Sequence, residues 1–174
     1  NGSGMSSAKK PFAAKEDYYG IKILRNGTWL YQGSPITRHN MVKLFASVLQ
    51  KDARGDFWLI TTAERGRIEV EDAPFTAVEL KAEDSGREQE LHFRTNLDEW
   101  VTAGPAHPIR VAFDPETKEP APYILIRKGL EARIARAVYY QMTELAVADA
   151  NEREVFGLWS GDTFFPIGKI HEQL

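Results

Sequence analysis

The sequence has 174 residues, of which 43% are hydrophobic and 27% charged, and its formal net charge at pH 7 is -3. This composition excludes disordered and collagen-like chains, and no apolar run approaches the about 20 residues that a membrane-spanning helix needs. The slight net acidity argues against a nucleic-acid-binding protein, and the absence of Cys excludes disulfides, thiolate catalysis and Cys-ligated zinc within the chain.

The first residues predict no folded element. Residues 1–4 precede Met5 and are typical of a tag remnant, and no apolar stretch follows Lys9 and Lys10, so a secretory signal is not expected. We expect residues 1–15 to be this tag remnant and a flexible tail, and the cytoplasm to be the compartment of the protein.

A hairpin and a helix follow. Asn26-Gly27 lies between two alternating runs and predicts a type I′ turn, which needs positive φ at both central residues. Ser34 can cap a helix whose first residue is Pro35, with Thr37 as a competing cap. An apolar stripe at helical spacing supports this helix: Met41, Leu44, Phe45, Val48 and Leu49. Gly55 is the predicted end of the helix.

Two more strands complete the first unit. Residues 57–62 are bulky and apolar on both faces, so both faces are expected to be covered, and residues 66–71 alternate as a partner strand. We therefore place an N-terminal β-β-α-β-β lobe at residues 16–72 and a C-terminal lobe at residues 73–174.

The C-terminal lobe begins with a long antiparallel hairpin around Ser85-Gly86. Four further strands are expected at residues 109–113, 123–127, 155–160 and 163–168. A helical stripe separates the second and third of them: Leu130, Ile134, Val138, Met142 and Leu145.

The element order suggests an internal duplication. Arg38 precedes the first stripe residue of helix one by three positions, and Arg127 precedes that of helix two by three. The predicted fold class is α+β, with duplicated β-β-α-β-β units and an antiparallel hairpin between them.

The segment GTWLYQGSPITRHNMVKLFASVL resembles a bacterial family of uncharacterised proteins, catalogued as domain of unknown function 1285. Residues 70–75, 94–96, 122–136 and 159–165 support this resemblance. It implies a duplicated α+β core, a C-terminal lobe similar to pleckstrin-homology-like folds, and a ligand site between the lobes for a nucleotide-type ligand with a role in signalling. It implies no accepted catalytic residues.

Arginines beside helix starts are the first candidates for an anion site. Helix N-termini attract anions, and Arg38 and Arg127 facing each other across the lobe interface would form a phosphate-sized clamp. Alternatively they pair with acids such as Glu64 or Asp162 and hold the lobes together, as buried arginines usually do. Arg136 lies on a second helix face that is poor in charge, so it needs a protein acid or a ligand anion as partner.

Polar residues at strand ends and a tryptophan extend the candidate site. Glu64 and Asn96 can bond a base edge or ribose, although these residues and Ser160 more often serve in turns or caps. Trp29 is expected to line a groove in the first hairpin, where it would stack a base. The candidate ligand-binding residues are therefore Arg38, Glu64, Asn96, Arg127, Arg136, Ser160 and Trp29. No metal site is predicted, because the four His residues are scattered and none has metal-ligand spacing. No cofactor or catalytic residue is predicted either, because the sequence has no Walker A loop, GxGxxG, HExxH or GxSxG motif.

The function that these features favour is a non-enzymatic binding protein for a small anionic, nucleotide-type ligand at the interlobe interface, acting in bacterial signalling. The alternative is a protein-interaction module of pleckstrin-homology-like type without a small ligand, which would bind a partner segment at a sheet edge. A hydrolase with Glu64 as base is the third possibility, against which the lack of an obvious nucleophile argues. Neither a nucleic-acid nor a membrane partner is expected.

Overall fold

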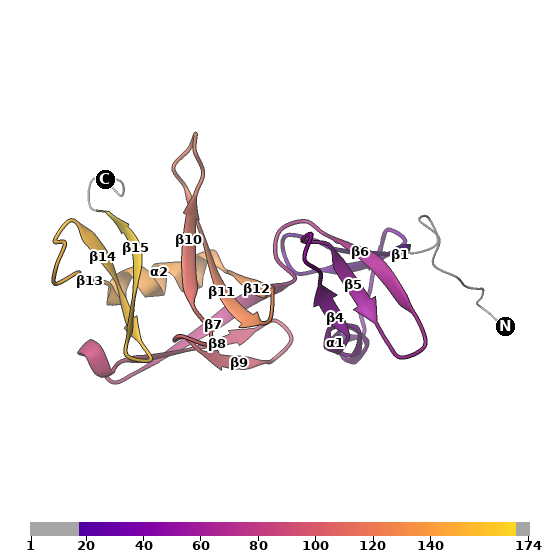
Figure 1. Cartoon of the computed structure of the whole chain (residues 1–174), viewed down its shortest axis with the longest axis horizontal. Helices are drawn as coiled ribbons and strands as arrows, with labels where there is room; N and C mark the ends of the chain where they lie inside the picture. The colour runs from indigo at the N-terminus through magenta and orange to yellow at the C-terminus, as the bar shows by residue number, and fades with distance from the viewer. Residues whose placement is uncertain (1–17, 170–174) are drawn as a thin grey trace. The chain divides into compact units, whose positions relative to one another are not determined.

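The computed structural model describes residues 18–169, and the chain divides after Ala73 into two compact units, which are described separately (Figure 1). The predicted tag remnant and tail at residues 1–15 lie outside the described residues. The fold is α+β and mainly β: the described part holds two α-helices, of nine and ten residues, and two six-stranded sheets. Neither helix is long and apolar enough to cross a membrane.

The N-terminal unit is one sheet and one helix. Its elements are β1 (Tyr18–Ile23), β2 (Trp29–Tyr31), β3 (Ser34–Pro35), α1 (His39–Ser47), β4 (Leu49–Lys51), β5 (Phe57–Ile60) and β6 (Arg65–Val70). The strand order is β3-β2-β1-β6-β5-β4, and the central pair, β1 and β6, is parallel. The two strands predicted after the helix are confirmed as β5 and β6.

The predicted hairpin at Asn26-Gly27 joins β1 to β2, but its turn is not of type I′. Only Gly27 has positive φ, at 94°. The Leu24 carbonyl accepts the Gly27 N–H at 2.9 Å, and the Asn26 side chain accepts the Thr28 N–H at 3.0 Å. The loop is therefore longer than two residues, which removes the need for a left-handed Asn26.

The helix start was predicted too early. Ser34 and Pro35 form β3, which pairs with β2 because Gln32 and Gly33, with φ of 49° and 85°, close a tight turn between them. The helix then begins at His39, with Arg38 at its N-cap and no side-chain capping hydrogen bond.

The apolar stripe of α1 is rotated from its predicted position. Val42 and Ala46 are buried, whereas Met41 and Leu44 are 37% and 65% exposed. The helix ends at Ser47, so the predicted end at Gly55 is wrong. Gly55, with φ of 92°, lies after β4.

The C-terminal unit has a second six-stranded sheet and a three-stranded sheet. Its first elements are β7 (Phe75–Glu83), the 3₁₀ turn η1 (Gly86–Glu88), β8 (Glu90–Thr95), β9 (Trp100–Thr102), β10 (Ile109–Phe113), β11 (Pro120–Arg127) and β12 (Leu130–Ile134). The remaining elements are α2 (Arg136–Leu145), β13 (Val147–Ala148), β14 (Val155–Ser160) and β15 (Thr163–Lys169). The larger sheet has the order β10-β11-β12-β7-β8-β9, and α2 contacts both β7 and β14 (Figure 1).

The predicted helix over residues 130–145 is wrong in its first third. Leu130, Ala132 and Ile134 are buried and alternate with half-buried residues, which is the period of a strand. Leu130 and Ile134 also fit a helical spacing, so the two periods cannot be separated there by apolar positions alone. Arg127 consequently ends β11, and Arg136 is the first residue of α2.

The duplication is present, but between other elements than those predicted. Each six-stranded sheet consists of two three-stranded meanders. The first strand of the first meander pairs in parallel with the last strand of the second: β1 with β6, and β7 with β12. The repeat is therefore β1–β6 against β7–β12 rather than a β-β-α-β-β unit, and the predicted hairpin β7–β8 belongs to the second copy. No helix stands between β9 and β10, so α1 has no counterpart, and the matching Arg38 and Arg127 offsets are a coincidence.

Candidate functional site

A cavity of about 600 Å³ opens in the C-terminal unit at the start of α2. Strand β12 delivers Arg133 to its wall, and the first turns of α2 supply Arg136, Tyr139 and Tyr140. We call this the α2 cavity. An arginine from β12 and an arginine and two tyrosines from α2 combine positive charge with aromatic surface. The cavity volume lies within the range of small-molecule sites.

The helix start adds to the positive charge. The Ala135 side chain cannot cap α2, so the N–H groups of its first turn have no side-chain acceptor. Arg136 is exposed and makes no ion pair with any residue that the structure describes, which corrects the prediction of a covered Arg136. The Arg133 guanidinium lies over the Tyr123 ring, 5.5 Å from its centroid, and has further contacts.

The Tyr139 hydroxyl is the unusual group of this cavity. Tyr139 is 6% exposed, yet its hydroxyl has no hydrogen-bond partner within residues 18–169. Burial also raises the pKa of this hydroxyl, so it stays protonated and available as a donor at neutral pH. A buried hydroxyl without a partner in the protein costs free energy, since buried polar groups in proteins are generally hydrogen-bonded.

The α2 cavity also carries one acid. Glu119, at the end of the β10–β11 loop, lies on the lining and is exposed. The cavity is therefore cationic at the helix start and offers a carboxylate acceptor elsewhere on its wall. Such an arrangement suits a ligand that has both an anionic group and hydrogen-bond donors.

The predicted site residues of the N-terminal unit take different positions. Arg38, at the N-cap of α1, is exposed, and no described residue forms an ion pair with it. Glu64 lies in the β5–β6 turn, where its carboxylate accepts the Tyr19 hydroxyl at 2.8 Å. Trp29 is 1% exposed and stacks on Phe45 with a centroid distance of 6.5 Å, so it belongs to the core rather than to a groove.

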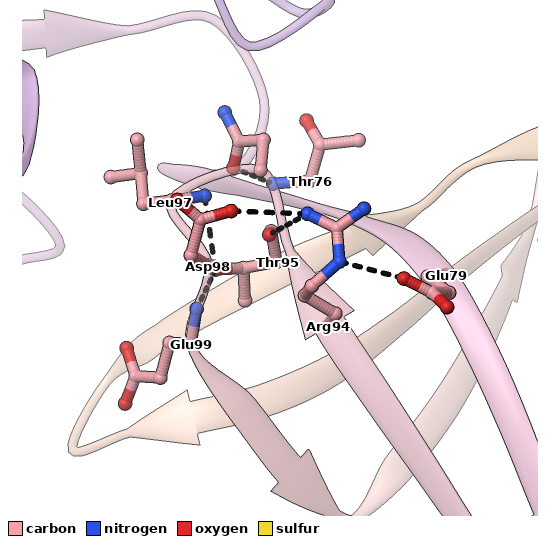
Figure 2. Close-up of polar contacts among 8 residues, drawn as sticks. Thr76, Glu79, Arg94, Thr95, Leu97, Asp98 and Glu99 are labelled. Carbon is pink, nitrogen blue, oxygen red and sulfur yellow. Dashed lines mark hydrogen bonds and ion pairs between the residues drawn. The ribbon is translucent and has the colours of Figure 1, made fainter. Parts of the chain in front are cut away.

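Asn96 has a structural role at the end of β8. Its backbone N–H donates to the Thr76 carbonyl at 2.8 Å, and its side-chain oxygen accepts the Thr76 N–H at 3.0 Å. In the same turn, the Arg94 guanidinium reaches Glu79 at 2.7 Å and Asp98 at 3.2 Å (Figure 2). The hydrogen bond to Glu79 raises the pKa of Arg94 further. Asn96 is thus a turn residue, the structural role that the sequence favours for it.

Thr95 ties the same turn together from inside. It is 1% exposed, and its hydroxyl accepts the N–H groups of Leu97 at 3.2 Å and Glu99 at 3.3 Å (Figure 2).

Replacing Thr95 by valine keeps the side-chain shape but removes this acceptor. We expect the free energy of unfolding of the C-terminal unit to fall by about 1–2 kcal/mol, measured by hydrogen exchange of its amides. Thr76→Val, which removes a hydroxyl with no hydrogen bond to the described residues, is the control, and equal losses would contradict the prediction.

Ser160 and Arg127 are also held by the fold. Ser160 is fully buried; its hydroxyl donates to the Ala103 carbonyl at 2.7 Å and accepts the Leu91 N–H at 2.9 Å. Arg127 lies over the Phe75 ring at 5.6 Å. Asp162, suggested as a partner of the arginines, pairs instead with Arg87 at 2.9 Å. Of the residues predicted in the C-terminal unit, Arg136 alone lines the α2 cavity.

One group of described residues has the composition of a metal site. The ligand atoms of Glu83, Glu90 and His92 lie within 4.8 Å of one another on the β7–β8 hairpin. His92 is held by Glu83 at 2.6 Å and by Thr102 at 2.7 Å. Spacing along the chain does not predict this group, because cross-strand pairing brings Glu83 opposite Glu90.

Three residues on the lining of the α2 cavity are not among those predicted from the sequence: Arg133, Tyr139 and Tyr140. The available signal was the alternation over residues 130–134, which would have placed Arg133 on a strand face beside the true helix start.

Comparison with known proteins gives one consistent family. The model of the DUF1285 N-terminal domain, a domain of unknown function, matches residues 12–73, and that of the C-terminal domain of the same protein of unknown function matches residues 74–167. A DUF1285 family protein from Silicibacter pomeroyi DSS-3 is 44% identical, with a TM-score of 0.83 over 90% of this chain and 83% of that one. A DUF1285 family protein from Shewanella baltica OS155 is 24% identical, with a TM-score of 0.57 over 74% and 93%, and supports the fold alone. No curated protein matches the chain.

Proposed function

The chain belongs to the DUF1285 family, and we propose that it is a binding protein for a small anionic ligand of the nucleotide type, held in the α2 cavity of the C-terminal unit. The observation that carries this proposal is that Arg133, Arg136 and Tyr139 line one cavity at the start of α2. A phosphate group accepts hydrogen bonds from guanidinium groups and from the N–H groups of a helix start.

The remaining walls suit the rest of a nucleotide. Tyr140 is 58% exposed and offers a ring face on which a base can stack. Glu119 offers acceptors for a ribose hydroxyl or a base amino group. The cavity volume of about 600 Å³ is adequate for a mononucleotide.

The proposed site differs from the clamp that the sequence suggests. Arg136, rather than Arg127, occupies the second helix start, and both arginines of the proposed site belong to one unit. The clamp of Arg38 and Arg127 at the interlobe interface stays a prediction. We further propose that ligand occupancy serves bacterial signalling, since cations and aromatic rings bind a nucleotide without requiring its turnover.

Nucleotide binding by variants of Arg136 tests the proposal. AMP, cyclic AMP, ADP, adenosine and inorganic phosphate are titrated into the full chain and followed by calorimetry and thermal unfolding. A bound nucleotide at 100 times its Kd stabilises the folded protein by about 2.7 kcal/mol. We expect Arg136→Ala to weaken binding of the phosphate-bearing compounds by at least about tenfold, and Tyr139→Phe to weaken it less.

The matched control is Arg153→Ala, because Arg153 is exposed in the same unit and does not line the cavity. Its binding constants should equal those of the unmodified chain. The proposal fails if no phosphate-bearing compound binds, or if Arg136→Ala and Arg153→Ala behave alike.

The alternative is a protein-interaction module whose C-terminal unit is of pleckstrin-homology-like type. Its support is exposed apolar surface, with Tyr31 50% and Leu44 65% exposed, and the outer edges of β9 and β10, which have no neighbouring strand in the sheet. In the β7–β8 hairpin, β12 pairs with β7 at residues 75–77 and β9 pairs with β8 at residues 92–94, so these parts of the hairpin offer no edge to a partner. A purified partner that binds Arg136→Ala as tightly as the unmodified chain, with no nucleotide bound by either, would favour this alternative.

A further inference from the structure

We propose a second binding site, in the N-terminal unit, for a small amphiphile with an apolar body and a protonated amine. It is a cavity of about 550 Å³, here called the α1 pocket. Its apolar walls come from β1, α1, β5 and the segment between β3 and α1: Ile21, Ile36, Met41, Phe45, Val48 and Leu59. Met41 remains 37% exposed and Tyr31, also on the lining, 50% exposed, so apolar surface of a kind usually buried faces this pocket.

One end of the α1 pocket is polar and negatively charged. Glu64 lines it, and the carboxylate accepts one hydrogen bond, from the Tyr19 hydroxyl at 2.8 Å. No described residue forms an ion pair with Glu64. The adjacent cation, Arg65, lies instead over the Trp58 ring, 4.1 Å from its centroid. A carboxylate can accept about four hydrogen bonds, so most of the acceptor capacity of Glu64 is unused by the protein.

The turn that carries Glu64 is held rigidly. The Thr61 hydroxyl accepts the N–H groups of Ala63 at 3.2 Å and Glu64 at 3.1 Å, and donates to the Glu64 carbonyl at 3.1 Å. The Thr61 N–H donates to the same carbonyl at 2.9 Å. The carboxylate is therefore offered from a preorganised loop, which lowers the entropic cost of binding a charged group there.

Tyr19 is positioned by a glycine. The Tyr19 ring lies directly over Gly66, so that a Cβ at Gly66 would overlap ring atoms of Tyr19. The close approach lets the ring form a pocket wall while its hydroxyl reaches Glu64. The polar end is thus built from Gly66, which has no side chain, the Tyr19 ring that packs over it, and the Glu64 carboxylate.

The negative charge of Glu64 favours a positively charged ligand group at the polar end of the α1 pocket. An ammonium group pairs with Glu64 and donates up to three hydrogen bonds, whereas a carboxylate in the same place would meet like charge. An alkyl or aromatic body removes the exposed apolar side chains from water. This site shares no residue with the α2 cavity and does not depend on nucleotide binding.

The inference is tested with three compounds that share one apolar chain and differ in the head group. Octylamine, octanol and octanoate are titrated into the full chain below the concentrations at which they aggregate, and binding is followed by calorimetry and NMR. We expect octylamine to bind at least about tenfold more tightly than octanol, and octanoate to bind most weakly. Glu64→Gln should bring octylamine to the level of octanol and leave octanol unchanged.

Three more variants separate the pocket from general surface binding. Met41→Asp, at a partly exposed position, should weaken octylamine and octanol together, whereas Leu44→Ser, on the same helix but outside the pocket, should change neither. Glu69→Gln, an exposed acid on β6, is the charge control for Glu64→Gln. The inference is overturned if the three compounds bind equally, if none binds, or if Glu69→Gln has the effect expected of Glu64→Gln.

Discussion

Replacing Gly157 by alanine is expected to cost the C-terminal unit more than about 3 kcal/mol of unfolding free energy, or to prevent its folding. Gly157 lies on β14 where the pairing with β15 shifts register. A Cβ there would overlap the Phe165 carbonyl and approach the Pro166 Cα at 2.8 Å. Because the obstruction is backbone of a paired strand, no side chain can rotate away to relieve it.

Gly104→Ala is the matched control, since Gly104 is also buried but its Cβ would meet only Gly161 at an ordinary 3.6 Å. Urea unfolding with hydrogen exchange as the readout separates the two units. We expect amides of the C-terminal unit to lose protection in Gly157→Ala and to keep it in Gly104→Ala. Full protection in Gly157→Ala would contradict the prediction, because it would show that the paired strands accommodate the added Cβ at little cost.

Ser160→Ala is expected to destabilise the same unit by about 2–4 kcal/mol. The substitution leaves two buried backbone groups, the Ala103 carbonyl and the Leu91 N–H, without their partner, and each such group costs about 1–3 kcal/mol. Ser160 joins the small sheet to β8 and to the segment after β9, so the loss falls on the contact between layers.

The control for Ser160→Ala is Ser85→Ala. Ser85 precedes η1 in the same unit, is exposed and caps nothing with its side chain, so its loss should stay within about 0.5 kcal/mol. Thermal and urea unfolding give both values. Similar stabilities for the two variants would mean that water replaces the Ser160 hydroxyl, and that the buried junction is open to solvent.

Local patterns predicted most strands of this fold. Residues 109–113 and 155–160 are strands with the predicted bounds, because alternation and short apolar runs report directly on strand faces. The failures lie where two periods coincide. Leu130 and Ile134 satisfy both a strand and a helix, and only the Gly129 turn, with φ of 71°, makes the strand pair with β11.

The candidate site was predicted less well than the strands, because residues that contact one another there are far apart in the sequence. Arg136 was found from its charge-poor neighbourhood, and it does line a cavity. The hydrogen-bond partners of Ser160 and Asn96 lie 57 and 20 residues away, at Ala103 and Thr76, so the sequence around each residue suggests a turn or cap role but does not identify the partner. A single sequence indicates which side chains are polar, but not which backbone groups will form hydrogen bonds with them.

The parallel central pair of each six-stranded sheet has a consequence for biosynthesis. In the N-terminal unit the earliest strand, β1, must wait for β6, the last, so the seam cannot close until residue 70 has left the ribosome. Local hairpins can form before then, but each three-stranded half keeps an open edge that invites association with other nascent chains. The second sheet repeats the delay between β7 and β12, so an open strand edge is present at two stages of one round of translation.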